Sequence, residues 1–179
     1  RIQIQWWMVA KYNLETYFSG VWQDQNFKCL EYSGYQLVDY VNAQKPSSVL
    51  DVGCGYNRFK GKIKNLVGID PYNDAADIKV SVEDYTSAPF EIALCLGSIN
   101  FGDVDYQLEK LHTLWRKEAI FRVNPGIPHA WADYGDVEWY PWSLDKIYDI
   151  AEKYDYEVKQ MEKEYTVQGD LRYFFIFAK

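Results

Sequence analysis

Apolar residues in the middle of the chain gather in short, nearly continuous runs separated by polar and turn-forming residues. Such runs are typical of parallel strands, because both faces of those strands are buried. Five strands are predicted, at Val49–Val52, Leu66–Ile69, Ile78–Val82, Glu91–Leu96 and Glu118–Val123. Short helical segments alternate with them, so the pattern predicts a parallel sheet with right-handed crossover connections.

Three longer helices are predicted around these strands. The first spans 24–44, where apolar residues recur every three or four positions, and it ends at a proline followed by two serines. The second spans roughly 103–116 and presents one apolar face, made of Val104, Leu108, Leu111 and Trp115. The third spans 144–154, because Ser143 can cap its first turn and Asp145 favours a helix N-terminus.

The end of the chain has a different pattern. Two strand-forming segments, "YEVKQMEKEYTV" and "LRYFFIFAK", flank the turn residues "QGD", which predicts an antiparallel hairpin. The whole chain is therefore expected to form a mixed, mostly parallel sheet of seven strands with helices on both faces. A chain of 179 residues suits a single domain. Residues 1–45 would form an N-terminal helical extension and residues 46–179 the α/β core.

Composition narrows the classes of partner. The chain is 48% hydrophobic and 18% aromatic, which is typical of a globular protein, and its net charge is −7. An acidic chain without a long basic run is repelled by phosphate backbones, so nucleic acid is disfavoured as a partner. No apolar run is long enough for a membrane span. Three scattered cysteines suggest a reducing compartment such as the cytoplasm, and the two histidines do not form a metal-binding pattern.

The stretch "VLDVGCG", beginning at Val49, ends a predicted strand in an acid and two glycines. Gly53 and Gly55 carry no side chains, so the backbone there can approach a ligand closely. Asp51 would repel a pyrophosphate and attract an ammonium group, which favours a ligand with an amino-acid end. Asp70 ends the next predicted strand, in "VGIDPY", where an acid can accept hydrogen bonds from a ribose diol.

A dinucleotide-binding loop needs a third small residue, and Arg58 stands near that position. A nucleotide-dependent oxidoreductase is therefore disfavoured. The stretches "VLDVGCG" and "VGIDPY", with the terminal hairpin, resemble class I S-adenosylmethionine-dependent methyltransferases from about Val49 to the C-terminus. The run "DVGCGYNRFKGKIKNLVGIDPYN" is also similar to small methyltransferase-like proteins encoded by bacteriophages, for which the host cytoplasm would be the location.

The resemblance implies a Rossmann-like fold and S-adenosylmethionine as cofactor. It places the cofactor along the strand ends, against Asp51, Gly53, Cys54, Gly55, Asp70, Pro71, Glu83, Asp84, Leu96 and Gly97. Asp51 would lie near the methionine amino group, and Asp70 would bind the ribose hydroxyls. Either Glu83 or Asp84 would face the adenine amino group. Leu96, Gly97 and Ser98 would lie beneath the sulfonium.

Two departures from the family pattern stand out. Tyr56 and Asn57 occupy the positions where a small residue and a third glycine are usual. The 19-residue spacing of Asp51 and Asp70 is about one helical turn shorter than usual. The first crossover helix is therefore expected to be short.

The acceptor side carries weaker signals. The loop at 124–142 is long, aromatic and acidic, so it is predicted to cover an acceptor pocket. Its acids favour a neutral or cationic acceptor, and His129 is a candidate general base. A structural histidine, and aromatic residues that pack on the sheet edge, remain alternatives. The strand tip at Leu96 lacks the proline motif of DNA amino-methylating enzymes. The alternative hypothesis is that the chain is a non-catalytic module with a methyltransferase fold, for example a binding or structural part of a viral assembly.

Overall fold

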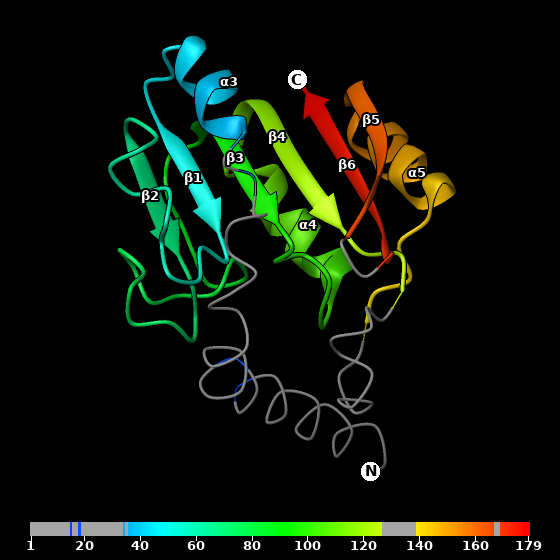
Figure 1. The fold of residues 1–179 in the computed structure, drawn as a ribbon, viewed down its shortest axis with the longest axis horizontal. Helices are drawn as coiled ribbons and strands as arrows, with labels where there is room; N and C mark the ends of the chain where they lie inside the picture. The colour runs from blue at the N-terminus through cyan, green and yellow to red at the C-terminus, as the bar shows by residue number, and fades with distance from the viewer. Residues whose placement is uncertain (1–14, 16–17, 19–33, 35, 127–138, 167–168) are drawn as a thin grey trace.

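The computed structural model describes residues 15, 18, 34, 36–126, 139–166 and 169–179. Within them, six strands form one sheet in the order β2-β1-β3-β4-β6-β5 (Figure 1). The strands are β1 (Val49–Val52), β2 (Leu66–Ile69), β3 (Phe90–Leu96), β4 (Trp115–Val123), β5 (Glu157–Tyr165) and β6 (Leu171–Ala178). Strands β1 to β4 are parallel, while β6 is antiparallel to both β4 and β5. The predicted mixed sheet with a C-terminal hairpin is confirmed.

Three helices are described, α3 (Leu37–Ala43), α4 (Val104–His112) and α5 (Leu144–Tyr154). The predicted cap of α5 is present, because the Ser143 hydroxyl accepts a hydrogen bond from the Lys146 amide at 3.1 Å. Helix α4 is capped in the same way by Asp103. Helices α4 and α5 thus begin where a short polar side chain accepts a hydrogen bond from a free backbone N–H, whereas α3 has no side-chain cap.

The helices lie on both faces of the sheet, because successive residues of a strand point to opposite sides. Leu108 of α4 and Ile147 of α5 share one core cluster with Ala93. Leu37 of α3 shares the other core cluster with Leu94, the next residue of β3. Figure 1 shows α4 and α5 behind the sheet in that view. The expected covering of both faces is confirmed.

The prediction of a strand at Ile78–Val82 is wrong. In the described structure this segment forms only an isolated parallel bridge, between Ile69 and Ile78. Two backbone amides, of Asp77 and Ile78, donate to the single carbonyl of Gly68, so the chain turns rather than runs beside β2. Ile78 is 42% exposed. A parallel strand is held by a ladder of backbone hydrogen bonds, and here the pairing with β2 stops at the single bridge, although Val82 is buried in the core. The sheet therefore has six described strands instead of seven.

Two helix boundaries also differ from the sequence-based prediction. Gly34 has φ +83°, which an α-helix cannot contain, so α3 begins only after it; the predicted residues 24–33 lie outside the described residues. The second predicted helix ends at His112, and Trp115 begins β4 as a buried strand residue. Residues 53–65, predicted to hold a short crossover helix, form turns. Whether residues 1–45 form a separate extension stays a prediction.

Candidate active site at the carboxyl edge

The carboxyl ends of β1 to β4 meet at one edge of the sheet (Figure 1). There the chain turns sharply through Gly53 and Gly55, at φ +65° and +53°. A Cβ atom on Gly53 would lie only 2.3 Å from the Cβ of Ser98, at the tip of β3. Glycine is required at Gly53 for two reasons, a left-handed backbone and a close contact between two strand ends. The predicted bare turn is therefore packed tightly against the end of β3.

Asp51 is buried directly beneath this turn, with 4% of its surface exposed. No described residue donates a hydrogen bond to its carboxyl group. Burial, with the negative charge of Asp70 as a second cause, raises the pKa of Asp51 to about 8. A buried carboxyl group without a donor is unusual, because buried polar groups are nearly always hydrogen-bonded. At neutral pH the group is therefore largely protonated, and a cation placed beside it would ionise it.

Asp70 lies at the end of β2 and has the opposite environment. One carboxylate oxygen accepts from the Gly55 amide at 3.0 Å. The other oxygen accepts from the Tyr72 and Asn73 amides, at 2.8 and 2.9 Å. Three of about four lone-pair positions are thus taken by backbone N–H groups. Asp70 therefore joins the glycine turn after β1 to the turn after β2, a role that sequence reasoning missed. Its predicted ribose contact stays a prediction.

The tip of β3 holds the other predicted residues. The Ser98 hydroxyl is buried and has no hydrogen-bond partner. Gly97 has φ +85°, and its amide donates to the Arg122 carbonyl at 2.8 Å. Asn100, which sequence reasoning did not single out, donates from its side chain to the Gly97 carbonyl and accepts from the Asn124 amide. These bonds fix the tip of β3 to the end of β4, and leave the Ser98 hydroxyl available.

The remaining predicted residues divide between the site and solvent. Glu83 is half-buried and accepts from the Gln107 side chain at 2.9 Å. Asp84 is exposed and accepts from the Ser81 hydroxyl. Pro71 is half-buried beside Asp70. Only one of the two acids predicted near adenine, Glu83, is therefore held toward the interior. Burial raises the pKa of the Cys54 thiol well above its usual range, so this thiol stays protonated.

Aromatic side chains form a row along the same edge. Phe18 stacks on Tyr72 with ring centroids 5.6 Å apart and an interplanar angle of 7°. Phe18 also meets Phe101 edge-on at 5.2 Å, and Phe101 lies 4.6 Å from Trp139. Burial is the main cause that raises the pKa of Tyr72, followed by the charges of Glu15, Glu83 and Asp70. Phe18, Tyr72 and Phe101 were missed from the sequence, because their proximity depends on tertiary folding.

The aromatic loop after β4 is described only in part. Its end packs as core, since Trp142 is 2% exposed and donates its indole N–H to the Ile99 carbonyl at 2.8 Å. The Tyr140 hydroxyl donates to Asp105 at 2.8 Å. The packing alternative thus holds for these two rings. His129 and the rest of 127–138 lie outside the described residues, so the predicted lid and general base stay predictions.

Metal-binding clusters and membrane-spanning helices are both absent from the described part of the chain. It contains no group of three or more histidine, cysteine, aspartate or glutamate side chains placed to hold a metal ion. None of its helices is long and apolar enough to cross a bilayer.

Solved structures with the same fold are S-adenosylmethionine-dependent methyltransferases. The 1,6-didemethyltoxoflavin-N1-methyltransferase of Burkholderia thailandensis, solved with 1,6-didemethyltoxoflavin and S-adenosylhomocysteine, matches with a TM-score of 0.71 and 14% identity, over 94% of this chain and 88% of that one. Magnesium protoporphyrin IX methyltransferase of Synechocystis PCC 6803, solved with S-adenosylmethionine, matches with 0.69 and 14%, over 95% and 97%.

N-methyltransferase NodS of Bradyrhizobium japonicum WM9, solved with S-adenosylhomocysteine, matches with a TM-score of 0.62 and 12% identity, over 97% of this chain and 98% of that one. At such identities the likeness establishes the fold, and the predicted Rossmann-like methyltransferase fold is confirmed. No protein-family model and no curated protein sequence matches the chain. The chemistry must therefore be argued from the site itself.

Proposed function

We propose that this protein transfers a methyl group from S-adenosylmethionine to a small-molecule acceptor. The fold supports the proposal, and structures that share it were solved with S-adenosylmethionine or S-adenosylhomocysteine. The observation that carries it is Asp51, a buried carboxyl group without a donor beneath the glycine turn. A buried acid in that state needs a cationic partner, and the ammonium group of the cofactor's methionine end is one.

The residues present fit the cofactor. Asp51 would hold the methionine ammonium, and the ligand would approach the turn at Gly55, which has φ +53° and carries no side chain. The unpartnered Ser98 hydroxyl would face the reacting end, at the tip of β3. Glu83, which also accepts from Gln107, and Tyr72, whose ring stacks on Phe18, would bind the base of the nucleoside through a hydrogen bond and an apolar contact. When bound, the cofactor supplies a methyl group already activated by its sulfonium.

The protein then has little covalent chemistry to perform. Its tasks are to align an acceptor atom with the methyl group and to exclude water. Asp70 serves the alignment, because it fixes two turns of the edge through three backbone amides. His129 remains the proposed base for an acceptor that must lose a proton, and its loop the proposed cover. The resemblance to bacteriophage proteins has no counterpart among the structures named above and stays a prediction.

Calorimetry with S-adenosylhomocysteine tests the proposal. The ligand ammonium should ionise Asp51, whose pKa of about 8 leaves it largely protonated at pH 7. Binding should therefore release close to one proton, seen as a binding enthalpy that differs between phosphate and Tris buffers. Asp51→Asn should remove the proton release and weaken binding about tenfold or more, as expected for the loss of a charged hydrogen bond.

The same acid predicts a pH dependence of the free protein. Its pKa is raised on folding, so the folded state holds a proton that the unfolded state loses above about pH 4. Asp51 therefore lowers stability progressively between about pH 4 and pH 8, and Asp51→Asn should flatten the profile and stabilise the ligand-free protein at pH 8. No heat with millimolar S-adenosylhomocysteine would overturn the proposal and favour the non-catalytic module. Binding without buffer dependence would show that Asp51 does not face the ammonium group.

A further inference from the structure

A buried arginine lies on β4 next to the proposed methyl-transfer position. Arg122 is 4% exposed and pairs in register with Leu96 on β3 and with Phe174 on β6. Its Nε and Nη2 atoms donate to the two carboxylate oxygens of Glu164, at 2.7 and 3.1 Å. This bidentate pair uses one edge of the guanidinium group. Nη1 is buried and hydrogen-bonds to no described residue, so the other edge of the group keeps an unpaired donor within the described part of the chain.

A second arginine lies beside the first. Arg172 is two residues before Phe174 on β6, so its side chain is on the same face of the sheet as Arg122. Its Nε is buried and has no hydrogen-bond partner. Burial lowers the pKa of Arg172, and the positive charge of Arg122 lowers it further. Among the described residues, Glu164 is the only carboxylate that hydrogen-bonds to either guanidinium group. The two guanidinium groups therefore have one hydrogen-bonded carboxylate between them, that of Glu164. Each group also keeps a buried N–H donor that is paired with no described residue.

The unpaired Nη1 donor of Arg122 lies near Leu96. The Nη1 atom of Arg122 and the Cδ1 atom of Leu96 are 3.5 and 2.8 Å from the point where a Cβ on Gly34 would sit. Gly34 has φ +83°, and a Cβ there would lie only 2.8 Å from Leu96 Cδ1, so the backbone before α3 passes close against Leu96 and Arg122. Leu96 ends β3, the strand whose tip carries Ser98. An anion held by the arginines would thus be fixed within one side-chain length of the reacting end of the proposed cofactor site.

We infer that Arg122 and Arg172 form an anion-binding subsite, and that the methyl acceptor carries an acidic group, most simply a carboxylate, which this subsite holds. Leaving buried guanidinium donors unpaired is costly, and a carboxylate oxygen pair matches the open edge of Arg122. Glu164 fixes the orientation of that edge. This inference rests on the proposed function and adds to it the chemical class of the acceptor.

The arginine pair changes the expectation drawn from the loop at 124–142. Its acids, among them Asp133, Asp136 and Glu138, favoured a neutral or cationic acceptor. A small zwitterionic or bipolar acceptor satisfies both features, because its acidic group would bind the arginines while its remainder stays neutral or cationic. Charge on the acceptor would then set its orientation, and orientation is what methyl transfer requires of the protein.

The test uses the full chain without cofactor, and sodium acetate as the probe. In ¹⁵N-labelled protein, acetate should shift the side-chain Nε–H signals of Arg122 and Arg172 saturably at millimolar concentration. Sodium chloride at the same ionic strength should not. Arg172→Gln keeps the Arg122–Glu164 pair and should weaken acetate binding about tenfold, since a charged hydrogen bond is lost. Arg116→Gln is the matched control, because Arg116 is exposed at the other end of β4 and should leave acetate binding unchanged.

The outcomes separate this inference from the proposed function. Linear, unsaturated shifts, or equal binding by wild type and Arg172→Gln, would overturn the anion subsite. Loss of S-adenosylhomocysteine binding in Arg172→Gln would also overturn it, because the arginines would then belong to the cofactor site. Saturable acetate binding by a protein that does not bind S-adenosylhomocysteine would support the subsite and defeat the methyltransferase proposal alone. Inorganic phosphate in place of acetate distinguishes the two sources of anion, and tighter phosphate binding would overturn the choice of a carboxylate.

Discussion

Two buried charged residues lie four positions apart on the same face of β4, and their surroundings differ. Glu118, near the amino end, is 2% exposed and accepts hydrogen bonds from Tyr40, Gln44 and Lys159. Arg122, near the carboxyl end, has one carboxylate partner and an open edge. The strand thus carries a fully paired charge where α3 joins the sheet, and an incompletely paired one where ligands bind in folds of this kind.

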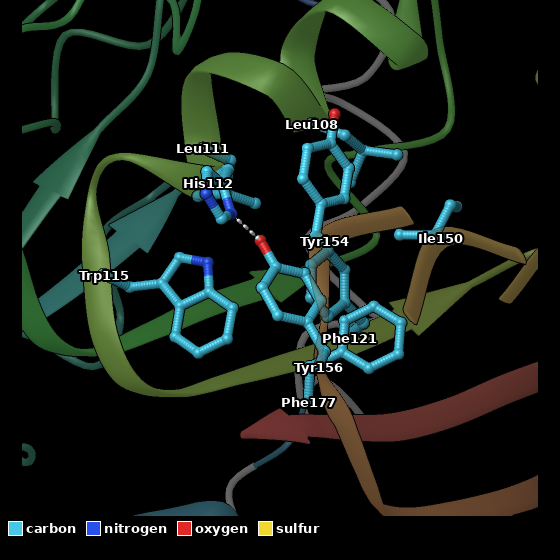
Figure 2. Close-up of a pocket in the computed structure, with 9 residues that line it drawn as sticks. All are labelled: Leu108, Leu111, His112, Trp115, Phe121, Ile150, Tyr154, Tyr156 and Phe177. Atoms are coloured by element: carbon cyan, nitrogen blue, oxygen red, sulfur yellow. Dashed lines mark hydrogen bonds between the residues drawn. The ribbon is translucent and has the colours of Figure 1, made fainter. Parts of the chain in front are cut away.

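The two edges of the sheet show the same contrast. At its amino edge, an aromatic pocket between α4, α5 and the strands is closed by its own side chains, among them Trp115, Tyr154 and Tyr156 (Figure 2). Lys179 lies over the Trp115 ring at 4.3 Å and donates to two backbone carbonyls. At the carboxyl edge, no described residue donates to Asp51 or hydrogen-bonds to the Ser98 hydroxyl. The amino edge therefore stabilises the fold, while the carboxyl edge keeps unpaired groups that a ligand would satisfy.

The largest effect should come from the glycine turn at the carboxyl edge. Gly53→Ala would force a side chain onto a backbone with φ +65° and within 2.3 Å of the Ser98 Cβ. The left-handed backbone costs about 1–2 kcal/mol and the overpacking about 1–3 kcal/mol, so the free energy of unfolding should fall by about 2–5 kcal/mol in urea titrations. Binding of S-adenosylhomocysteine should be lost as well.

Gly61→Ala provides the matched control for that substitution. Gly61 has φ +78°, and a Cβ there would meet no heavy atom within 4 Å. It should cost only the backbone share, about 1–2 kcal/mol, and leave ligand binding intact. Equal losses for the two variants would show that the turn after β1 is not held against β3.

The second effect concerns Asp70, which holds the same edge together. Asp70→Ala would leave three backbone amides without their acceptor. Because the carboxylate is only half-buried, water can replace part of the loss, and the expected cost is about 2–3 kcal/mol of unfolding free energy. Asp74→Ala, at an exposed ion pair with Lys79, should leave the urea midpoint unchanged. If Asp70→Ala is as stable as wild type, the carboxylate serves the ligand and not the turns.

These two residues also show how far the sequence leads. The alternation of strands and helices and the C-terminal hairpin were predictable from the sequence, because apolar runs indicate burial and a glycine turn indicates local backbone geometry. The motif around Asp51 indicated an ammonium partner from charge alone. The sequence could not predict that no described residue donates a hydrogen bond to the Asp51 carboxyl group, because this depends on which donors the folded chain brings near.

Other features were out of reach for the same reason. The proximity of the two arginines depends on the register of β4, β5 and β6. This register sets Arg122 beside Arg172 and Glu164, although 42 residues separate Arg122 from Glu164. The segment Ile78–Val82 had the composition of a strand, but its backbone pairs with β2 only at Ile78, and composition does not reveal pairing. The aromatic row of Phe18, Tyr72 and Phe101 joins three distant segments. Local patterns gave the elements, while long-range contacts set the site.

The third effect tests the closed end of β4. Glu118→Ala removes the shared acceptor of Tyr40, Gln44 and Lys159, which joins α3 and β5 to the sheet. Lys159 is 47% exposed in its side chain and can turn to water, so the expected loss of unfolding free energy is about 2 kcal/mol rather than the full cost of a broken buried pair. Acetate and S-adenosylhomocysteine binding should not change. A loss of either at 25 °C in the folded variant would contradict the division between the two ends of the strand.

The smallest effect is expected in the aromatic pocket of Figure 2, where the Tyr156 hydroxyl lies 2.5 Å from Nδ1 of His112. Burial raises the pKa of Tyr156, so the hydroxyl keeps its proton and donates to the neutral imidazole. Burial, followed by the charge of Lys179, lowers the pKa of His112, so its contribution to stability is present above the unfolded pKa of about 6.5 and is lost as the pH falls. Tyr156→Phe should therefore cost about 1 kcal/mol at pH 7.5 and less at an acidic pH low enough to protonate His112, because protonated Nδ1 no longer accepts a hydrogen bond. Urea midpoints at the two pH values measure the difference, and ligand binding should stay at the wild-type value. An equal cost at both pH values would mean that the ring packing, and not the hydrogen bond to His112, is what Tyr156 contributes.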